Sequence, residues 1–145
     1  VHLIMNGIVG LLLGWAAFPA ILVALALQAV FFQFGGITAL GVNTVIMAVP
    51  AVAGYYAFSP LLRRSRPVAL AAAFACGLMA VCIGGIIVGM ALVFTEEKFF
   101  EVAVAVVAAH LPVMIIEGLV TALCVAFLRK VQPAMLPGFS SKEVT

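Results

Sequence analysis

Apolar residues run through this chain in five stretches, which short polar or glycine-containing interruptions separate. The stretches lack the alternation of apolar and polar positions that is typical of membrane barrel strands, so each predicts a helix. Because only helices and closed barrels span lipid, we expect an all-α fold, a multi-span transmembrane helix bundle. A single transmembrane domain covers residues 1–145, and its five helical segments are predicted at Leu3–Gly14, Phe18–Phe32, Asn43–Leu62, Val68–Phe94 and Phe99–Leu128.

Charged side chains are too rare for a water-soluble domain. They make up 8% of the residues and hydrophobic side chains 67%, against about 25% and about 45–50% in soluble domains. No charged residue occurs in 1–62 or 67–95, and Glu117 is the only one in 102–128. The scattered net charge of +2 also excludes a nucleic-acid-binding surface.

The connection between the second and third segments carries a cluster of glycines. Three glycines interrupt the apolar residues 33–42, which predicts a non-helical or re-entrant loop there. Non-helical backbone at membrane depth must be buried in protein or line a cavity.

Basic residues predict the orientation of the chain. Arginines in 63–66 and the basic pair 129–130 are predicted to face the cytoplasm, because short cytoplasmic loops are rich in Lys and Arg. The chain is therefore expected to be a multi-pass protein of the cytoplasmic (inner) membrane. Counting the spans back places the turn at Trp15 inside, and places outside His2, the Gly35-Gly36 loop and Asn43.

His2 is the first candidate for metal chemistry. Imidazole suits nickel, cobalt, zinc and copper, although a single histidine at a membrane interface is also compatible with an ordinary polar role. Asn6 lies four residues on and would share a helical face with His2, where it could orient the imidazole or form an interhelical hydrogen bond.

A second polar group lies on the last segment. His110 and Glu117 are seven residues apart and fall on one helical face, which Thr121 continues. Their axial separation of about 10 Å is too long for both to bind one ion directly. Since ionisable groups in membranes usually face the bundle interior, this stripe is interpreted either as a polar relay for a cation or as an interhelical network.

The sequence contains none of the catalytic motifs sought. HExxH, GxSxG and the phosphate-binding GxxxxGK[ST] are absent, and the chain has no Asp, so it is not expected to be an enzyme or to hydrolyse ATP itself. No cofactor is expected. The three cysteines lack CxxC spacing and are interpreted as packing residues.

Several motifs resemble those of CbiM, the cobalt substrate-capture component of energy-coupling-factor transporters, and of its nickel counterpart NikM. The similarity lies in VHL-x-x-NG at the start, in FGGITALGVNT at 34–44, and in AHLP and IEG around His110 and Glu117. It covers nearly the whole chain in the same order.

This resemblance implies a membrane-embedded substrate-binding subunit of an ATP-driven cobalt uptake transporter, which would serve cobalamin biosynthesis. Its partners would be a transmembrane coupling subunit, ABC-type ATPase subunits and the transported Co²⁺ or Ni²⁺. In the family a planar, nitrogen-rich metal site uses an N-terminal Met-His pair and a later histidine, which His2 matches. Asn43 and Gln33 match or lie beside the loop near the metal and would support its ligands.

The chain also departs from the family pattern, because the opening Met-His segment and the helices that follow it have no counterpart here. The sequence is therefore expected to be N-terminally incomplete, or to receive those ligands from another chain. Nickel uptake and a structural subunit that binds no metal remain alternatives, as does an intramembrane enzyme using His110 and Glu117. Unchanged metal accumulation after replacing His2 would favour the structural subunit, and a turnover lost in Glu117→Gln would favour the enzyme.

Overall fold

The computed structural model describes residues 4–33 and 35–137, and these residues contain helices and turns but no strand. The α-helices are α1 (Asn6–Leu13), α2 (Ala17–Phe32), α3 (Leu40–Phe58), α4 (Arg66–Thr95) and α5 (Phe100–Val131). Short 3-10 helices follow four of them, at Gly14–Ala16, Ser59–Arg63, Glu97–Phe99 and Pro133–Met135. The predicted all-α fold is confirmed.

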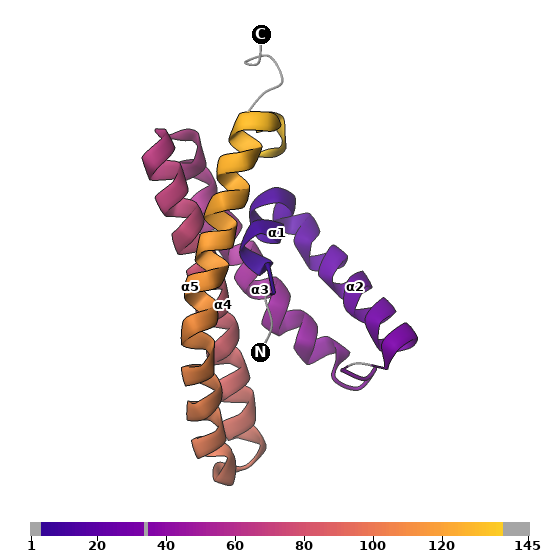
Figure 1. Cartoon of the computed structure of the whole chain (residues 1–145). Coiled ribbons are helices and arrows are strands. Elements are labelled where there is room, and N and C mark those ends of the chain that lie inside the picture. Colours follow the sequence, from indigo (N-terminus) through magenta and orange to yellow (C-terminus); the bar gives the residue numbers. More distant parts are fainter. Residues whose placement is uncertain (1–3, 34, 138–145) are drawn as a thin grey trace.

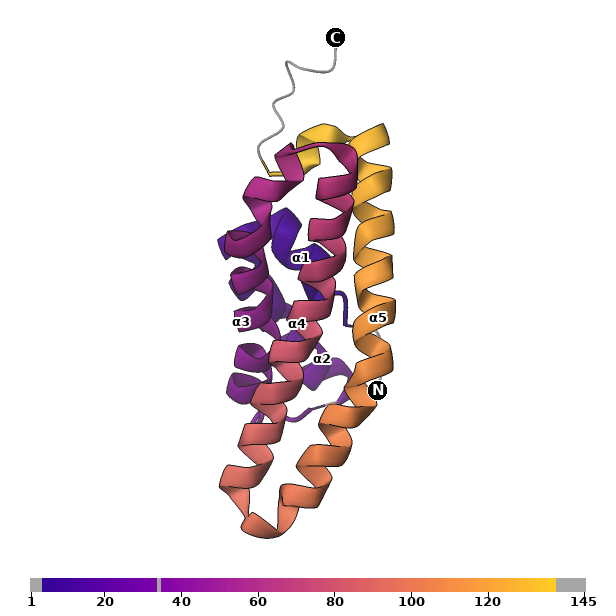
Figure 2. The same ribbon diagram turned by 90° about the vertical axis from the view of Figure 1, so that its left-hand side faces the viewer.

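Three long helices form the body of the molecule. Figure 2 shows α3, α4 and α5 side by side, with α4 between the other two. The hairpin of α4 and α5 extends beyond the other helices at the end where the Glu97–Phe99 turn joins them (Figure 1). Helix α1 packs against α3, α4 and α5, whereas α2 packs mainly against α3.

The chain reverses direction between α1 and α2. Along α1, Gly10 lies against Ala51 and Gly14 lies against Tyr55, so α1 runs parallel to α3. Gly14 then adopts φ 56°, a left-handed conformation that favours glycine. Helix α2 returns from this turn toward the α2–α3 connection (Figure 1). The predicted turn near Trp15 is therefore confirmed.

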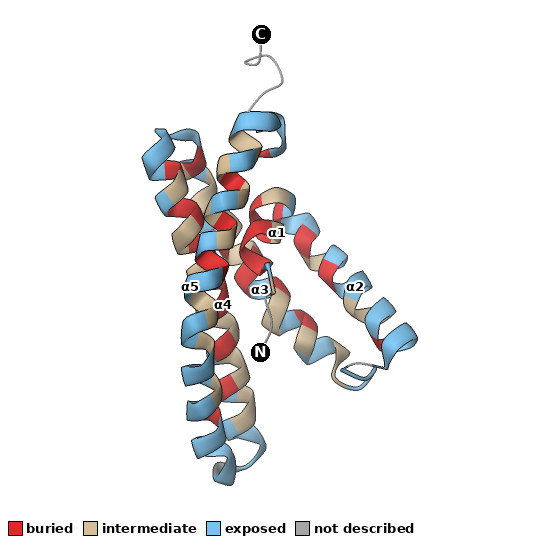
Figure 3. Cartoon of the chain, in the orientation of Figure 1, coloured by how far each residue is buried: buried red, intermediate tan, exposed pale blue. Residues whose placement is uncertain are grey.

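Within residues 4–33 and 35–137, four helical stretches are long and apolar enough to cross a membrane, by length and composition. They are Asn6–Phe32, which includes the reversal, Leu40–Arg63, Arg66–Thr95 and Phe100–Val131. Only 22–33% of the residues in their most apolar windows are buried inside the protein. Most of their apolar surface therefore faces outward, as expected for helices in lipid. Buried residues gather where α1 meets the long helices (Figure 3).

The five predicted segments correspond to the five helices, with shifted ends. Helices α4 and α5 each extend into flanking polar residues, and the Asn43–Leu62 segment begins earlier, at Leu40. The non-helical loop predicted over 33–42 is therefore too long at its C-terminal end. Helix α3 begins at Leu40 although Gly41 disfavours helical backbone by about 1 kcal/mol.

The two basic groups lie at the same end of the bundle, as the orientation argument requires. An Nη2 of Arg129 donates a hydrogen bond to the backbone carbonyl of Arg64, at 3.3 Å. The α2–α3 connection and the α4–α5 turn both lie toward the opposite end (Figure 1). Which end faces the cytoplasm stays a prediction from the charges.

Candidate functional site

The segment that leads into α1 is held by an acidic side chain in the middle of α5. The backbone N–H of Ile4 donates to Oε2 of Glu117, at 3.1 Å, and the Glu117 side chain is buried, with 1% of its surface exposed. Glu117 is the eighteenth of the 32 residues of α5, so α1 begins at mid-height in the bundle. A carboxylate at a helix N-terminus accepts from backbone N–H groups that have no partner within the helix.

Glycines allow α1 to come this close. A Cβ on Gly7 would lie 2.8 Å from Cα of Gly77 on α4, and a Cβ on Gly77 would lie 2.7 Å from Oγ1 of Thr121. Thr121 in turn donates its hydroxyl to the backbone carbonyl of Glu117, at 2.8 Å. The backbones of α1, α4 and α5 therefore meet directly beside Glu117.

His110 lies on the same inward side of α5, nearly two turns before Glu117. Its ring Nδ1 is 2.6 Å from the backbone carbonyl oxygen of Val106. A carbonyl oxygen only accepts hydrogen bonds, so Nδ1 carries a proton, and in the neutral form of the ring Nε2 is the nitrogen with a free lone pair. Glu117 and Thr121 are buried and His110 is half-buried, and α5 continues through Pro112.

Asn43, in the first turn of α3, lies against the glycine-rich loop that connects α2 to α3. Gly35 and Gly36 adopt φ 80° and 65°, and a Cβ on Gly35 would lie 3.0 Å from Nδ2 of Asn43. Gln33, at the end of α2, is exposed and also left-handed, with φ 53°. The loop and the first turn of α3 therefore place Asn43 against glycine backbone, whereas the Gln33 side chain projects from the protein surface.

His2 lies outside the described residues, as do Val1 and Leu3. The prediction that His2 shares a helical face with Asn6 therefore involves a residue outside the described part of the chain. Helix α1 begins at Asn6, and Met5 before it has φ 59°. Ile4 lies at mid-height, not at the outer end where the sequence pattern places the start of the first segment.

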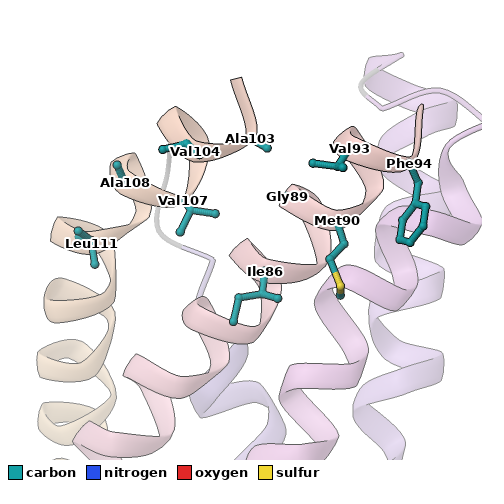
Figure 4. A pocket seen from close by; sticks show the side chains of 10 residues that line it. All are labelled: Ile86, Gly89, Met90, Val93, Phe94, Ala103, Val104, Val107, Ala108 and Leu111. Carbon is teal, nitrogen blue, oxygen red and sulfur yellow. The ribbon is translucent and has the colours of Figure 1, made fainter. Parts of the chain in front are cut away.

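The described residues contain no group of three or more His, Cys, Asp or Glu side chains that could bind a metal. A hollow of about 660 Å³ forms a groove between α4 and α5, and all ten residues that line it are apolar or glycine (Figure 4). Ile86, Met90 and Leu111 are among them. This groove offers no charged or nitrogen ligand to an ion.

Sequence reasoning missed the partner of Glu117. The partner is a backbone N–H, that of Ile4, and backbone groups leave no signal in residue types. The only available signal was the glycine at position 7, which permits the close approach but does not say which helix approaches.

The fold and these polar groups define a class: a polytopic helical membrane protein with polar side chains turned into the bundle. Residues 1–135 match the CbiM family, described as "Cobalt uptake substrate-specific transmembrane region". The chain belongs to this family. The family is a transport component and not an enzyme family. No solved structure gives a significant match.

Curated relatives are similar over most of the chain. "Putative metal transport protein" of Haemophilus influenzae is 36% identical over 139 residues, which cover 94% of this chain and 68% of that protein. "Cobalt transport protein CbiM" of Sorangium cellulosum is 34% identical, covering 90% and 62%. "Fused nickel transport protein NikMN" of Rhodobacter capsulatus is 37% identical, covering 90% and 43%. The chain thus spans between about two fifths and two thirds of the length of these relatives.

Proposed function

We propose that this chain is the membrane-embedded, substrate-binding part of a cobalt uptake transporter. The observation that carries this proposal is the family match over residues 1–135. The geometry supports it, because Glu117 fixes the start of α1 inside the bundle and the segment that carries His2 leads directly into that start.

In this proposal His2 supplies an imidazole nitrogen to the metal ion. Asn43 and Gln33 act near the bound ion, where outer hydrogen bonds orient the ligands and affect metal affinity. Asn43 suits this role better than Gln33, because Asn43 lies against Gly35 whereas the Gln33 side chain is exposed. The remaining ligands would come from residues outside this sequence or from another chain.

Uptake would be driven by ATP through a transmembrane coupling subunit and ABC-type ATPase subunits, in the cytoplasmic membrane. Support comes from the family match and from the four apolar spans among the described residues. Cobalt delivered in this way would serve cobalamin biosynthesis. Nickel is the second candidate ion, because relatives with similar identity are named as nickel transport proteins.

The test is metal binding at equilibrium by the detergent-purified chain beside its His2→Ala variant, with Co²⁺ and Ni²⁺ offered separately and purification through a tag without histidine. The expected result is tight, stoichiometric binding that His2→Ala removes, leaving at most a weaker binding. Since a nitrogen site generally binds Ni²⁺ more tightly than Co²⁺, tighter binding of Co²⁺ would identify cobalt as the substrate. Binding that is unchanged in His2→Ala would contradict the proposal, as would no binding when the full-length relatives bind under the same conditions.

A further inference from the structure

A small internal cavity lies beneath the start of α1, apart from the apolar groove. Its volume is about 60 Å³, and all four spans contribute to its wall. One water needs roughly 10–15 Å³ of such space, so the cavity has room for an ion that keeps part of its hydration. Three residues that line it carry atoms able to bind a metal: Asn6 of α1, Met47 of α3 and His110 of α5.

The cavity exists because α4 presents small residues to it. Ala80, Gly84 and Gly85 line that side. A Cβ on Gly85 would lie 3.6 Å from Cγ of His110, which is ordinary van der Waals contact, so the glycine leaves unfilled space beside the ring.

His110 has the hydrogen bonding that is typical of a metal-binding histidine. Its Nδ1 donates to the backbone carbonyl of Val106, and metal-binding histidines commonly donate their other ring N–H to a backbone carbonyl. No described residue forms a hydrogen bond with Nε2, nor with the side-chain amide of Asn6, which is only 5% exposed. Two polar groups therefore line the cavity without protein partners among the described residues.

No positive charge at the cavity opposes a cation. Among the described residues no Lys or Arg lines the cavity. Imidazole and thioether ligands select transition metals over Mg²⁺ or Ca²⁺.

We propose that the cavity between Asn6, Met47 and His110 is a second, weaker site for the transported divalent transition-metal ion, with Nε2 of His110 as its main ligand. This inference rests on the proposed function, since the ion would enter the cavity after leaving the segment that carries His2. A transport path requires sites that bind weakly enough to release the ion. The neutral ligands of this cavity meet that requirement.

The test uses Co²⁺ absorption in the visible range with the full chain purified through a tag without histidine. The chain has only two histidines, His2 and His110. In the His2→Ala background we expect saturable binding of one Co²⁺, at least ten-fold weaker than in the unmodified chain. Adding His110→Phe should abolish this absorption, and adding Met47→Leu should weaken binding several-fold at nearly constant volume.

Gly85→Ala gives a test that removes no ligand, because its methyl group occupies space beside His110 at normal contact distance. We expect it to weaken the second site at least five-fold. Gly89→Ala is the matched control, since Gly89 lies one turn further along α4 and does not line this cavity. Circular dichroism establishes that each variant is folded, and the Met47 and Gly85 variants decide the question if His110→Phe does not fold.

Failure of this inference is distinct from failure of the proposed function. If His2→Ala binds no Co²⁺ at millimolar concentration, or if its weak binding survives His110→Phe, the cavity is not a metal site. The proposed function is tested instead by the difference in Co²⁺ affinity between the unmodified chain and the His2→Ala variant.

Discussion

The contact between α1 and α3 leads to a specific prediction for Gly10→Ala. A Cβ at this position would overlap the backbone carbonyl oxygen of Ala51, and would lie 2.6 Å from its carbonyl carbon and 2.8 Å from its Cα. Ordinary contacts begin near 3.4 Å. All three obstructing atoms belong to the backbone of α3, so no side-chain rotation can make room, and the two helices must separate.

The expected loss of stability is the difference between two opposing effects. Forcing an extra methyl group into a packed interface costs about 1–3 kcal/mol. Replacing glycine by alanine inside a helix stabilises the helix by about 1 kcal/mol. Gly10→Ala should therefore lower the free energy of unfolding by up to about 2 kcal/mol relative to the unmodified chain, and by about 1–3 kcal/mol relative to a glycine-to-alanine change at an open helical site.

The assay is reversible unfolding in mixed micelles, driven by sodium dodecyl sulfate and followed by circular dichroism and tryptophan fluorescence. Trp15 is the only tryptophan in the sequence and lies at the α1–α2 turn, edge-on to Tyr56 with 6.3 Å between ring centroids. Its fluorescence therefore reports on the displaced part of the molecule. We expect the fluorescence transition of Gly10→Ala to occur at lower detergent fraction than in the unmodified chain.

Gly41→Ala is the matched control. Gly41 also lies in a helix, but a Cβ there would have no atom within 4 Å, so only the gain in helix propensity remains. This variant should be as stable as the unmodified chain or slightly more stable. Equal stability of the Gly10 and Gly41 variants would refute the reasoning, because it would mean that α1 does not pack on α3 as described.

Three further predictions concern Glu117, the orientation of the chain and the loop. Glu117→Ala should speed amide hydrogen exchange at Ile4 and lower the free energy of unfolding by about 1–3 kcal/mol, because a half-buried donor loses its acceptor. Glu117→Gln keeps an acceptor oxygen and should do neither. Equal exchange in both variants would contradict the hydrogen bond between Ile4 and Glu117. In intact cells a membrane-impermeant maleimide should label Lys98→Cys but not Ser65→Cys, and the reverse pattern would show that the basic end faces outward. Asn43→Ala should weaken Co²⁺ binding roughly ten-fold, as measured by equilibrium dialysis, and unchanged affinity would remove it from the metal site.

The sequence predicts the number and identity of the helices well, because long uncharged runs have no other stable form in lipid. It also predicts that His110 and Glu117 face inward, since helical spacing fixes which residues share a face. The depth at which α1 begins could not be predicted in this way. That depth depends on the backbone of Ile4 meeting Glu117, a tertiary contact between residues 113 positions apart.

The cavity was equally inaccessible to sequence reasoning. It depends on small residues of α4 lying opposite Met47 and His110, which lie on different helices and whose alignment follows only from how the helices pack. The Met residues of the apolar runs carry no distinguishing signal, because Met in such a run is usually a packing residue.

Helix α1 also shields a thiol. Cys76 of α4 is fully buried, and its Sγ donates to the backbone carbonyl of Gly7, at 3.8 Å. Cys82 and Cys124 are only half-buried. A small lipid-soluble alkylating reagent should therefore modify Cys76 only when α1 moves away from α4. The rate of this modification, compared with the rates at Cys82 and Cys124, reports how often that movement occurs without any introduced label.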